Sequence, residues 1–235
     1  MSEQKGFVSV PSVQSPIVVS VYGPRALFTL PQHNVERLSS PVPPKSSLKG
    51  ILRAVYKHDG MNYEIDRVYV CNKVDRDVIW RNEVTDTQVF GDGFSPKVYL
   101  DARRCRSPRG TSFLVDVRYV VEAHIVELPH FWPDSRHHSL DEHYKMFFRH
   151  LRRGACQHTP WLGCREFEGC VEEFSGPVES YYHGRKERFG ILLEDILYTR
   201  QGLEFPVWCD TGIVDGVVTY YGERIYPKGM PPGKE

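Results

Sequence analysis

Hydrophobic and polar positions alternate along much of this chain, a period typical of strands that bury one face. The β-branched run IVVSVYG at 17–23 ends at a glycine and predicts a strand. Apolar and polar residues alternate through 63–72, and the longest strand candidate runs from Phe113 to Leu128. A further strand is expected within EFEGCVEEF, residues 166–174. These segments predict the strands of a sheet.

Two segments follow the period of a helix instead. In KSSLKGILRAVYK, residues 45–57, apolar residues recur at the i, i+3, i+4 and i+7 positions of one face, and Pro43 and Pro44 suit a helix start. A second helix is predicted over about 139–153, where an apolar stripe runs along one side. The residues of that stripe are Leu140, Tyr144, Phe147, Phe148 and Leu151.

The order of these elements predicts an α+β fold. Strand, helix, strand, an inserted β-hairpin at about 73–111, strand, helix and strand match a ferredoxin-like (RRM-like) domain over 16–175. In such a domain two helices cover one face of an antiparallel sheet, and we expect the other face to be open to a ligand. Residues 176–227 predict a small C-terminal antiparallel β subdomain, and 1–15 and 228–235 are expected to be flexible ends.

Composition narrows the class of protein. The 235 residues are 40% apolar and 26% charged, which is ordinary for a protein with a packed core. The apolar runs are far shorter than a membrane-spanning helix needs and no secretory signal is recognisable, so we expect a cytoplasmic protein without a membrane partner. In that setting the six cysteines are expected to be reduced thiols.

Charge is balanced over the whole chain but not along it. The 30 basic and 30 acidic residues cancel, so the overall field does not indicate a nucleic-acid partner. Residues 102–115 and 143–165, however, carry several basic residues and no acid, whereas 166–195 carries more acidic than basic residues. This distribution predicts one positive and one negative face, although ordinary solvated surface charge explains each run equally well.

The stretch RRGACQHTPWLGCREFEGC, residues 152–170, holds three cysteines. Structural zinc sites and redox centres both use cysteine pairs at C-x2-C spacing, and no such pair is present here, so we interpret these cysteines as packing residues. What remains is a loop with Gly163, which lets a backbone approach a ligand, Arg165, which suits a phosphate, and Trp161, whose indole can stack on a base. The loop is therefore a candidate contact for a phosphate chain.

The stretch DSRHHSLDEH, residues 134–143, is a rival candidate because its acids and histidines suggest a divalent-metal cluster. The spacing matches no defined metal motif, and a polar loop entering a helix explains it as well. We expect no metal and no other cofactor, and keep metal-assisted hydrolysis as an alternative that a chelator would reveal. The candidate ligands are Asp134, His137, His138, Asp141, Glu142 and His143.

Four blocks, in order, carry a family resemblance: IVVSVYGPRALFTLPQHNVERLSSPVPPKSSLKGILRAVY, FLVDVRYVVEAHI, EHYKMFFRHLRRG and WLGCREFEG. Over roughly 17–174 they resemble the RAMP-superfamily CRISPR-associated proteins of Cas family five, subtype I-C, also called Dvulg. The resemblance implies a ferredoxin-like domain with a C-terminal β extension. It also implies an endoribonuclease that cuts precursor CRISPR RNA (crRNA) within its repeat and keeps the 5′ handle inside the Cascade surveillance complex.

The resemblance also assigns site residues. The family's catalytic tyrosine corresponds to Tyr56 and its histidine to His143, whereas the position of its lysine is Glu142 here. The implied reaction is a metal-independent transesterification that leaves a 2′,3′-cyclic phosphate. Arg149 or an arginine of the 152–165 loop would then supply positive charge, and Glu142 is expected to raise the pKa of His143. The residues predicted to bind RNA are Lys49, Arg103, Arg104, Arg106, Arg109, Arg149, Arg152, Arg153, Trp161 and Arg165.

Hypotheses of different classes follow from this resemblance. The first is a repeat-processing nuclease whose partners are the precursor crRNA repeat hairpin, the 5′ handle, and the backbone and large subunits of Cascade. The second is a non-catalytic structural subunit that binds the handle while another nuclease cuts. Both predict salt-dependent RNA binding, and only the first predicts cleavage. A third, a small-molecule enzyme on the same scaffold, would be favoured by failure to bind RNA.

Overall fold

The computed structural model describes residues 5–9, 16–31, 36–84, 100–127, 138–198 and 204–227. The helices within these ranges are α1 (Lys45–Val55) and α2 (Leu140–Arg153). The strands are β1 (Gly6–Ser9), β2 (Ile17–Ala26), β3 (Arg37–Leu38), β4 (Met61–Val70), β5 (Asp75–Val84), β6 (Arg106–Glu127), β7 (Cys170–Glu173), β8 (Val178–Ser180), β9 (Lys186–Tyr198), β10 (Glu204–Val214) and β11 (Val217–Ile225).

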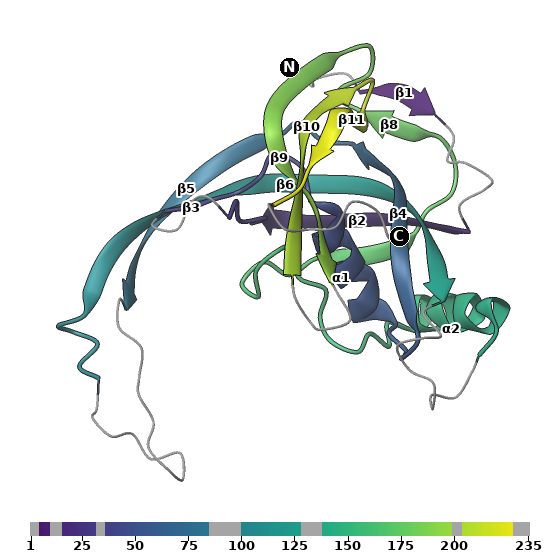
Figure 1. Ribbon diagram of the computed structural model, residues 1–235, viewed down its shortest axis with the longest axis horizontal. Coiled ribbons are helices and arrows are strands. Elements are labelled where there is room, and N and C mark those ends of the chain that lie inside the picture. Colours follow the sequence, from purple (N-terminus) through teal and green to yellow (C-terminus); the bar gives the residue numbers. More distant parts are fainter. Residues whose placement is uncertain are drawn as a thin grey trace, which may run out of the picture.

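One large sheet organises the molecule. Its main path runs β7-β2-β6-β4-β11-β10-β9, and every neighbouring pair on that path is antiparallel. β3 and β5 pair with β6 beside this path, and β1 pairs with β8 in a separate small sheet. α1 lies beneath the middle of the sheet, and α2 lies next to the end of β6 (Figure 1). The predicted antiparallel sheet with two helices is thus confirmed.

Both helices bury the face that their apolar period predicted. In α1, Leu48, Leu52 and Val55 are buried in the core beneath the sheet. In α2, Phe147 is fully buried and Phe148 packs against the same core, whereas the first residue of the predicted stripe, Leu140, is exposed. The amphipathic period therefore predicted which side of each helix packs inward.

Within the predicted hairpin insertion, 73–111, β5 and the start of β6 form an arm that projects from the body (Figure 1). β5 pairs with the first half of β6, from Asp75 opposite Val115 to Val84 opposite Arg106. The returning side of this arm is not a separate strand, because β6 continues for 22 residues from the arm into the centre of the sheet. Residues 85–99 lie outside the described part of the chain.

The C-terminal strands β9, β10 and β11 share a sheet and a core with the rest of the molecule. β11 joins the main sheet through the pair of Val217 with Tyr69 of β4. Leu192 and Ile213 belong to the same buried cluster as Leu48 of α1. The predicted C-terminal segment 176–227 therefore packs on α1 as well as extending the sheet.

The face of the sheet opposite the helices is partly covered. Side chains alternate across a strand, so Val120 of β6 points away from the helices. It packs in a second, smaller core with Tyr69, Val178 and Val18. The expectation of an open face is therefore wrong over this part of the sheet. No helix among the residues that the structure describes is long and apolar enough to cross a membrane.

Candidate functional site

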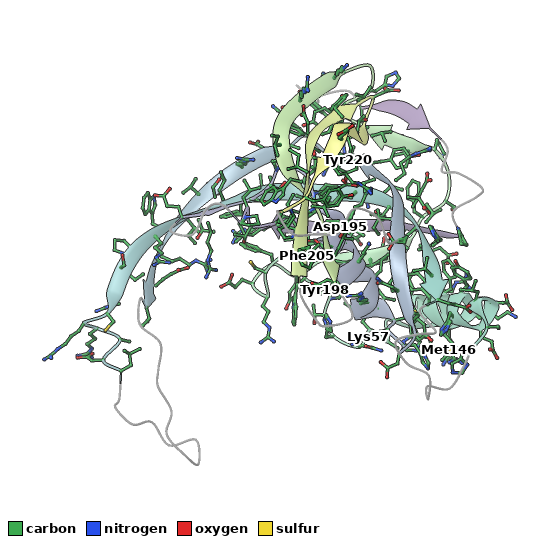
Figure 2. All side chains as sticks on the ribbon, in the orientation of Figure 1. Lys57, Met146, Asp195, Tyr198, Phe205 and Tyr220 are labelled. Carbon is green, nitrogen blue, oxygen red and sulfur yellow. The ribbon has the colours of Figure 1, made fainter. Side chains whose placement is uncertain are left out.

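Tyr56 stands where α1 ends, and its side chain is held from two sides. The residue caps the helix in an extended backbone conformation, with its N–H donating to the Leu52 carbonyl. The hydroxyl of Tyr63 donates to the carbonyl of Tyr56 at 2.7 Å. The Tyr56 hydroxyl lies 2.9 Å from Nδ1 of His143 and 3.5 Å from the sulfur of Met146. Figure 2 labels Lys57, the residue after Tyr56, and Met146 of α2.

His143 is placed by the way α2 begins. Ser139 and Glu142 form a capping box, in which the Glu142 N–H donates to the Ser139 hydroxyl and the Ser139 N–H donates to the Glu142 carboxylate at 2.8 Å. This start sets the helical phase so that His143 and Phe147, one turn apart, face inward. His143 is only 3% exposed. The structure thus brings together the two residues that the resemblance assigned to catalysis.

Three further histidines surround this pair. The rings of His58 and His138 lie 5.2 and 5.7 Å from that of His143 between centroids, and 4.9 Å from each other. The ring of His150 lies 5.4 Å from that of Tyr56. We call Tyr56, His58, His138, His143 and His150 the histidine cluster.

Burial decides the protonation of the central pair. It lowers the pKa of His143, and the neighbouring His58 and His138 lower it further, whereas Glu127 and Glu142 act in the opposite direction. Glu142 thus raises the pKa of His143 as expected, but burial and the two histidines outweigh it, so the net shift is downward. Burial also raises the pKa of Tyr56, against the charge of Arg149. At neutral pH His143 is neutral and Tyr56 keeps its proton.

No cation replaces the family's lysine beside His143 in sequence. The Glu142 carboxylate accepts a hydrogen bond from the Ser139 N–H. The Lys145 side chain is exposed, and its ammonium pairs with Asp141 across one turn of the helix at 2.5 Å. Arg149 is the predicted cation whose charge acts on Tyr56. It lines a shallow hollow of about 390 Å³ on α2 together with Tyr144, Phe148, Arg152 and Arg153.

The loop after α2 packs closely on its own protein at Gly163. α2 ends at Gly154 in the left-handed conformation, and the chain then folds back on β2, with the Leu27 N–H donating to the Leu162 carbonyl. Gly163 has φ of 95°, and a Cβ there would lie 1.9 Å from the carbonyl oxygen of Leu27. The sequence predicted that Gly163 lets the backbone approach a ligand; in the structure Gly163 lies against the backbone of Leu27 instead. Cys156 and Cys164 pack against the core, whereas Cys170 is exposed.

Trp161 and Arg165 contact each other in this loop. The ring of His158 stacks on that of Trp161 at 4.7 Å between centroids, and the Arg165 guanidinium lies 5.0 Å from the Trp161 centroid. Trp161 thus already has a stacked ring and a cation beside it within the loop. Its contact with RNA stays a prediction.

The remaining predicted RNA-binding residues fall into separate places. Lys49 is 7% exposed, and its ammonium pairs with Glu64 at 3.0 Å and Asp195 at 2.9 Å, so it joins α1 to β4 and β9 beneath the surface. Arg152 is bound in bidentate fashion by Glu173. Arg153 is exposed at the end of α2.

The arginines of the arm form their own group. Arg103 and Arg106 are exposed, Arg104 pairs with Asp101 at 3.3 Å, and Arg109 lies 3.6 Å from Glu83. The sequence analysis missed Trp80 of β5, which is 68% exposed on the same arm. The arm and α2 lie at opposite ends of the molecule, so the two basic clusters do not form one patch (Figure 1).

The candidate metal ligands at 134–143 lie only partly within the described residues. Asp134 and His137 lie outside the described residues, whereas His138, Asp141, Glu142 and His143 lie within them. Across the ranges that the structure describes, no group of three or more histidine, cysteine, aspartate or glutamate side chains is arranged to hold a metal ion.

Comparison with known proteins places this chain among relatives. Residues 17–209 match the family Cas_Cas5d, described as CRISPR-associated protein (Cas_Cas5). The chain belongs to this family. Two relatives are named CRISPR pre-crRNA endoribonuclease Cas5d: one from Thermus thermophilus, 36% identical over 68% of this chain and 65% of its own, and one from Mannheimia succiniciproducens, 32% identical over 64% and 69%. The match thus spans slightly less than two thirds of the Thermus relative.

Solved structures agree with that placement. A crystal structure of a CRISPR-associated protein, 25% identical, covers 88% of this chain and 91% of its own with a TM-score of 0.64. A functionally uncharacterized protein from Streptococcus mutans, 22% identical, shares the fold with a TM-score of 0.62 over 88% of this chain and 92% of its own.

In this Cas5-family chain, sequence reasoning missed His58 and His150. His58 lies in the short connection between α1 and β4, and His150 lies seven positions after His143 on α2. The spacing of His143 and His150 by two helical turns was a usable signal that both lie near one helix face. Nothing in the local pattern around His58 indicated that its ring would meet α2.

Proposed function

We propose that this chain is a CRISPR RNA-processing endoribonuclease that works in the cytoplasm. Its substrate is precursor crRNA, which it cuts within the repeat, and it then stays bound to the 5′ handle as a Cascade subunit. The observation that carries this proposal is the hydrogen bond between Tyr56 and His143, because it joins the two residues that the resemblance assigns to catalysis across 87 positions of sequence. The names of the Thermus and Mannheimia relatives support the same activity.

The reaction we propose is a transesterification without a metal ion. The ribose 2′-oxygen attacks the neighbouring phosphorus, the bond to the 5′-oxygen breaks, and a 2′,3′-cyclic phosphate and a 5′-hydroxyl result. Such a step needs acid–base catalysis and positive charge near the phosphate. His143 exchanges the proton, Tyr56 fixes the orientation of its ring, and Arg149 supplies charge.

The scaffold we propose is ferredoxin-like. The chain order β2, α1, β4, β6, α2, β7 is a β-α-β-β-α-β succession, and the sheet order β7-β2-β6-β4 supports it. RNA lies along the exposed arginines, with Arg103 and Arg106 on the arm and Arg149 and Arg153 on α2. Because these groups lie at two ends of the molecule, a repeat hairpin and its handle span the distance better than a short strand.

A purely structural role is the second candidate, and two observations favour it. His143 is 3% exposed, so RNA reaches it only if the cluster opens. The position of the family's lysine carries Glu142, whose carboxylate is used to cap α2. A subunit of this kind binds the handle and leaves the cutting to another nuclease.

The experiment that separates the two uses the purified protein and labelled repeat RNA of its own host in excess EDTA. A parallel substrate carries a 2′-deoxy nucleotide at the scissile position. Cleavage at one position that the deoxy substitution blocks supports the transesterase. Tight binding without cleavage, also when magnesium or manganese is added, would favour the structural subunit.

A further inference from the structure

His58 lies where a second acid–base group of the reaction belongs. Tyr56 has extended backbone, and side chains two positions apart on extended chain point to the same side. Accordingly Tyr56 and His58 both approach α2, while Lys57 between them is exposed. The His58 ring lies 5.2 Å from that of His143, and His58 is partly exposed where His143 is buried.

The hydrogen bond of His58 determines which of its nitrogens exchanges a proton. Nδ1 lies 2.6 Å from the carbonyl oxygen of Asp59. A carbonyl oxygen can only accept, so Nδ1 keeps its proton whether the ring is neutral or charged. The proton that comes and goes is therefore on Nε2, which is the nitrogen left for a substrate.

The contacts of His143 allow a complementary state, because a hydroxyl can donate as well as accept. Its Nδ1 faces the Tyr56 hydroxyl at 2.9 Å, and that hydroxyl is also within 3.5 Å of the Met146 sulfur. When the hydroxyl donates to the sulfur, its oxygen accepts from Nδ1 of His143. The Nε2 of the neutral His143 ring then carries a lone pair, which is the state of a base.

We propose that His58 is the general acid of the cleavage and His143 the general base. This assignment rests on the proposed function. Once the cluster opens to RNA, Nε2 of His143 takes the proton of the 2′-hydroxyl as the bond from the 2′-oxygen to phosphorus forms. The bond from phosphorus to the 5′-oxygen breaks, and that oxygen takes the proton from Nε2 of protonated His58. His143 ends charged and His58 neutral, and exchange with water restores both.

Neighbouring groups are less suited to the acid role. Nδ1 of His138 faces the Glu142 carboxylate at 3.7 Å, which orients that ring toward the helix cap. Lys145 is paired with Asp141 on the exposed side of α2. His58 also offers what the family's lysine would have supplied, because an imidazolium brings positive charge to the phosphate.

The test compares two repeat RNAs in single-turnover cleavage. One has the natural linkage, and the other carries sulfur in place of the bridging 5′-oxygen at the cut site, a leaving group that needs no proton. We expect His58→Gln to slow cleavage of the natural RNA by about 10²-fold or more. The variant should cleave the sulfur-containing RNA at a rate within a few-fold of the wild-type rate. His143→Gln is expected to be slow on both, because the 2′-hydroxyl still needs a base.

Matched controls keep the outcome interpretable. His124→Gln removes a histidine of β6 that pairs with Asp66 of β4 and is not part of the histidine cluster, and it is expected to match wild type on both RNAs. Affinity of His58→Gln for 2′-deoxy RNA and its melting temperature report whether it folds and binds. Wild-type rates for His58→Gln on natural RNA, or a defect that persists with sulfur, would overturn the assignment. So would the same rescue pattern in His138→Gln instead.

Failure of the proposed function itself looks different. If wild-type protein cuts neither RNA, there is no cleavage for His58 to assist, and both proposals fall together. If wild type cuts both while His58→Gln behaves like His124→Gln, the nuclease stands and only the role of His58 is lost.

Discussion

The regions before and after α2 both contain residue types that can bind a ligand or take part in catalysis, but they differ in what those residues contact. At the start of α2, the histidine cluster collects side chains from the end of α1, the connection to β4 and α2 itself, with the Tyr56 hydroxyl on Nδ1 of His143 and the rings of His58 and His138 close by. After its end, the 154–169 loop contacts β2 through backbone hydrogen bonds and close packing of Gly163 on Leu27. The histidine cluster brings polar side chains into contact with one another, whereas the 154–169 loop fixes the path of the backbone.

The difference teaches how to interpret a run of cysteines, glycines and arginines. Residue types that can bind a ligand serve packing equally well, and only their contacts distinguish the two uses. A substitution in the cluster should therefore affect chemistry with little loss of stability, and a substitution in the loop should do the reverse.

The largest expected effect is on cleavage by His143→Gln. Loss of the acid–base group should slow cutting by about 10² to 10⁴-fold while RNA affinity changes little. Single-turnover rates beside a binding titration with 2′-deoxy RNA check this. Cutting at the wild-type rate would remove His143 from catalysis, and a parallel loss of affinity would make it a binding residue.

A substitution in the 154–169 loop is expected to lower the free energy of unfolding instead of the cleavage rate. Gly163→Ala places a Cβ 1.9 Å from the Leu27 carbonyl oxygen, and should lower the free energy of unfolding by about 3 kcal/mol or more. Gly154→Ala is the matched control, since φ there is 62° but no atom lies within 4 Å of the added Cβ, and about 1 kcal/mol is expected. Urea unfolding of both variants gives the two values; equal losses would contradict the tight approach at Gly163.

Adjacent arginines at the junction of the two regions should differ in RNA binding. Arg152 is engaged by Glu173, whereas Arg153 is exposed and no ion pair holds it within the described part of the chain. Arg153→Ala is expected to reduce the steepness of the salt dependence of binding by about one counterion, and Arg152→Ala by clearly less. Affinities over a series of salt concentrations test this, and the reverse order would place Arg152 on the RNA.

The smallest expected effect is a pH dependence of stability from the cluster. Because the pKa of His143 is lowered in the folded protein, the unfolded chain binds more protons once the pH falls below about 6.5. Stability from neutral His143 is full above that pH and is lost as the pH falls toward the lowered pKa. The groups facing it are Tyr56, His58, His138, Glu127 and Glu142.

The measurement is urea unfolding of wild type and His143→Gln at about pH 7.5 and about pH 5. The stability advantage of wild type should shrink at the lower pH. An advantage that stays constant or grows on acidification would show that burial does not disfavour the charged ring.

Much of the fold was predictable because it depends on local periods. Alternation located β4, runs rich in β-branched residues located β2 and the central part of β6, and the apolar stripes located α1 and α2 to within a few residues. The start of α2 is set by the capping box of Ser139 and Glu142, which lie within four consecutive residues and so form a local signal. The resemblance supplied Tyr56 and His143, which local pattern alone did not distinguish from an ordinary core tyrosine and a surface histidine.

Other features depended on how distant segments meet. The sequence by itself determined the helices, the strands and the alternation that separates two faces of the sheet. Only the tertiary structure decided that Lys49 pairs with Glu64 and Asp195, that Gly163 meets Leu27, and that His58 joins His143. The physical reason is that period and propensity act over a few residues, whereas these contacts form only after α1 and α2 have been fixed against one sheet.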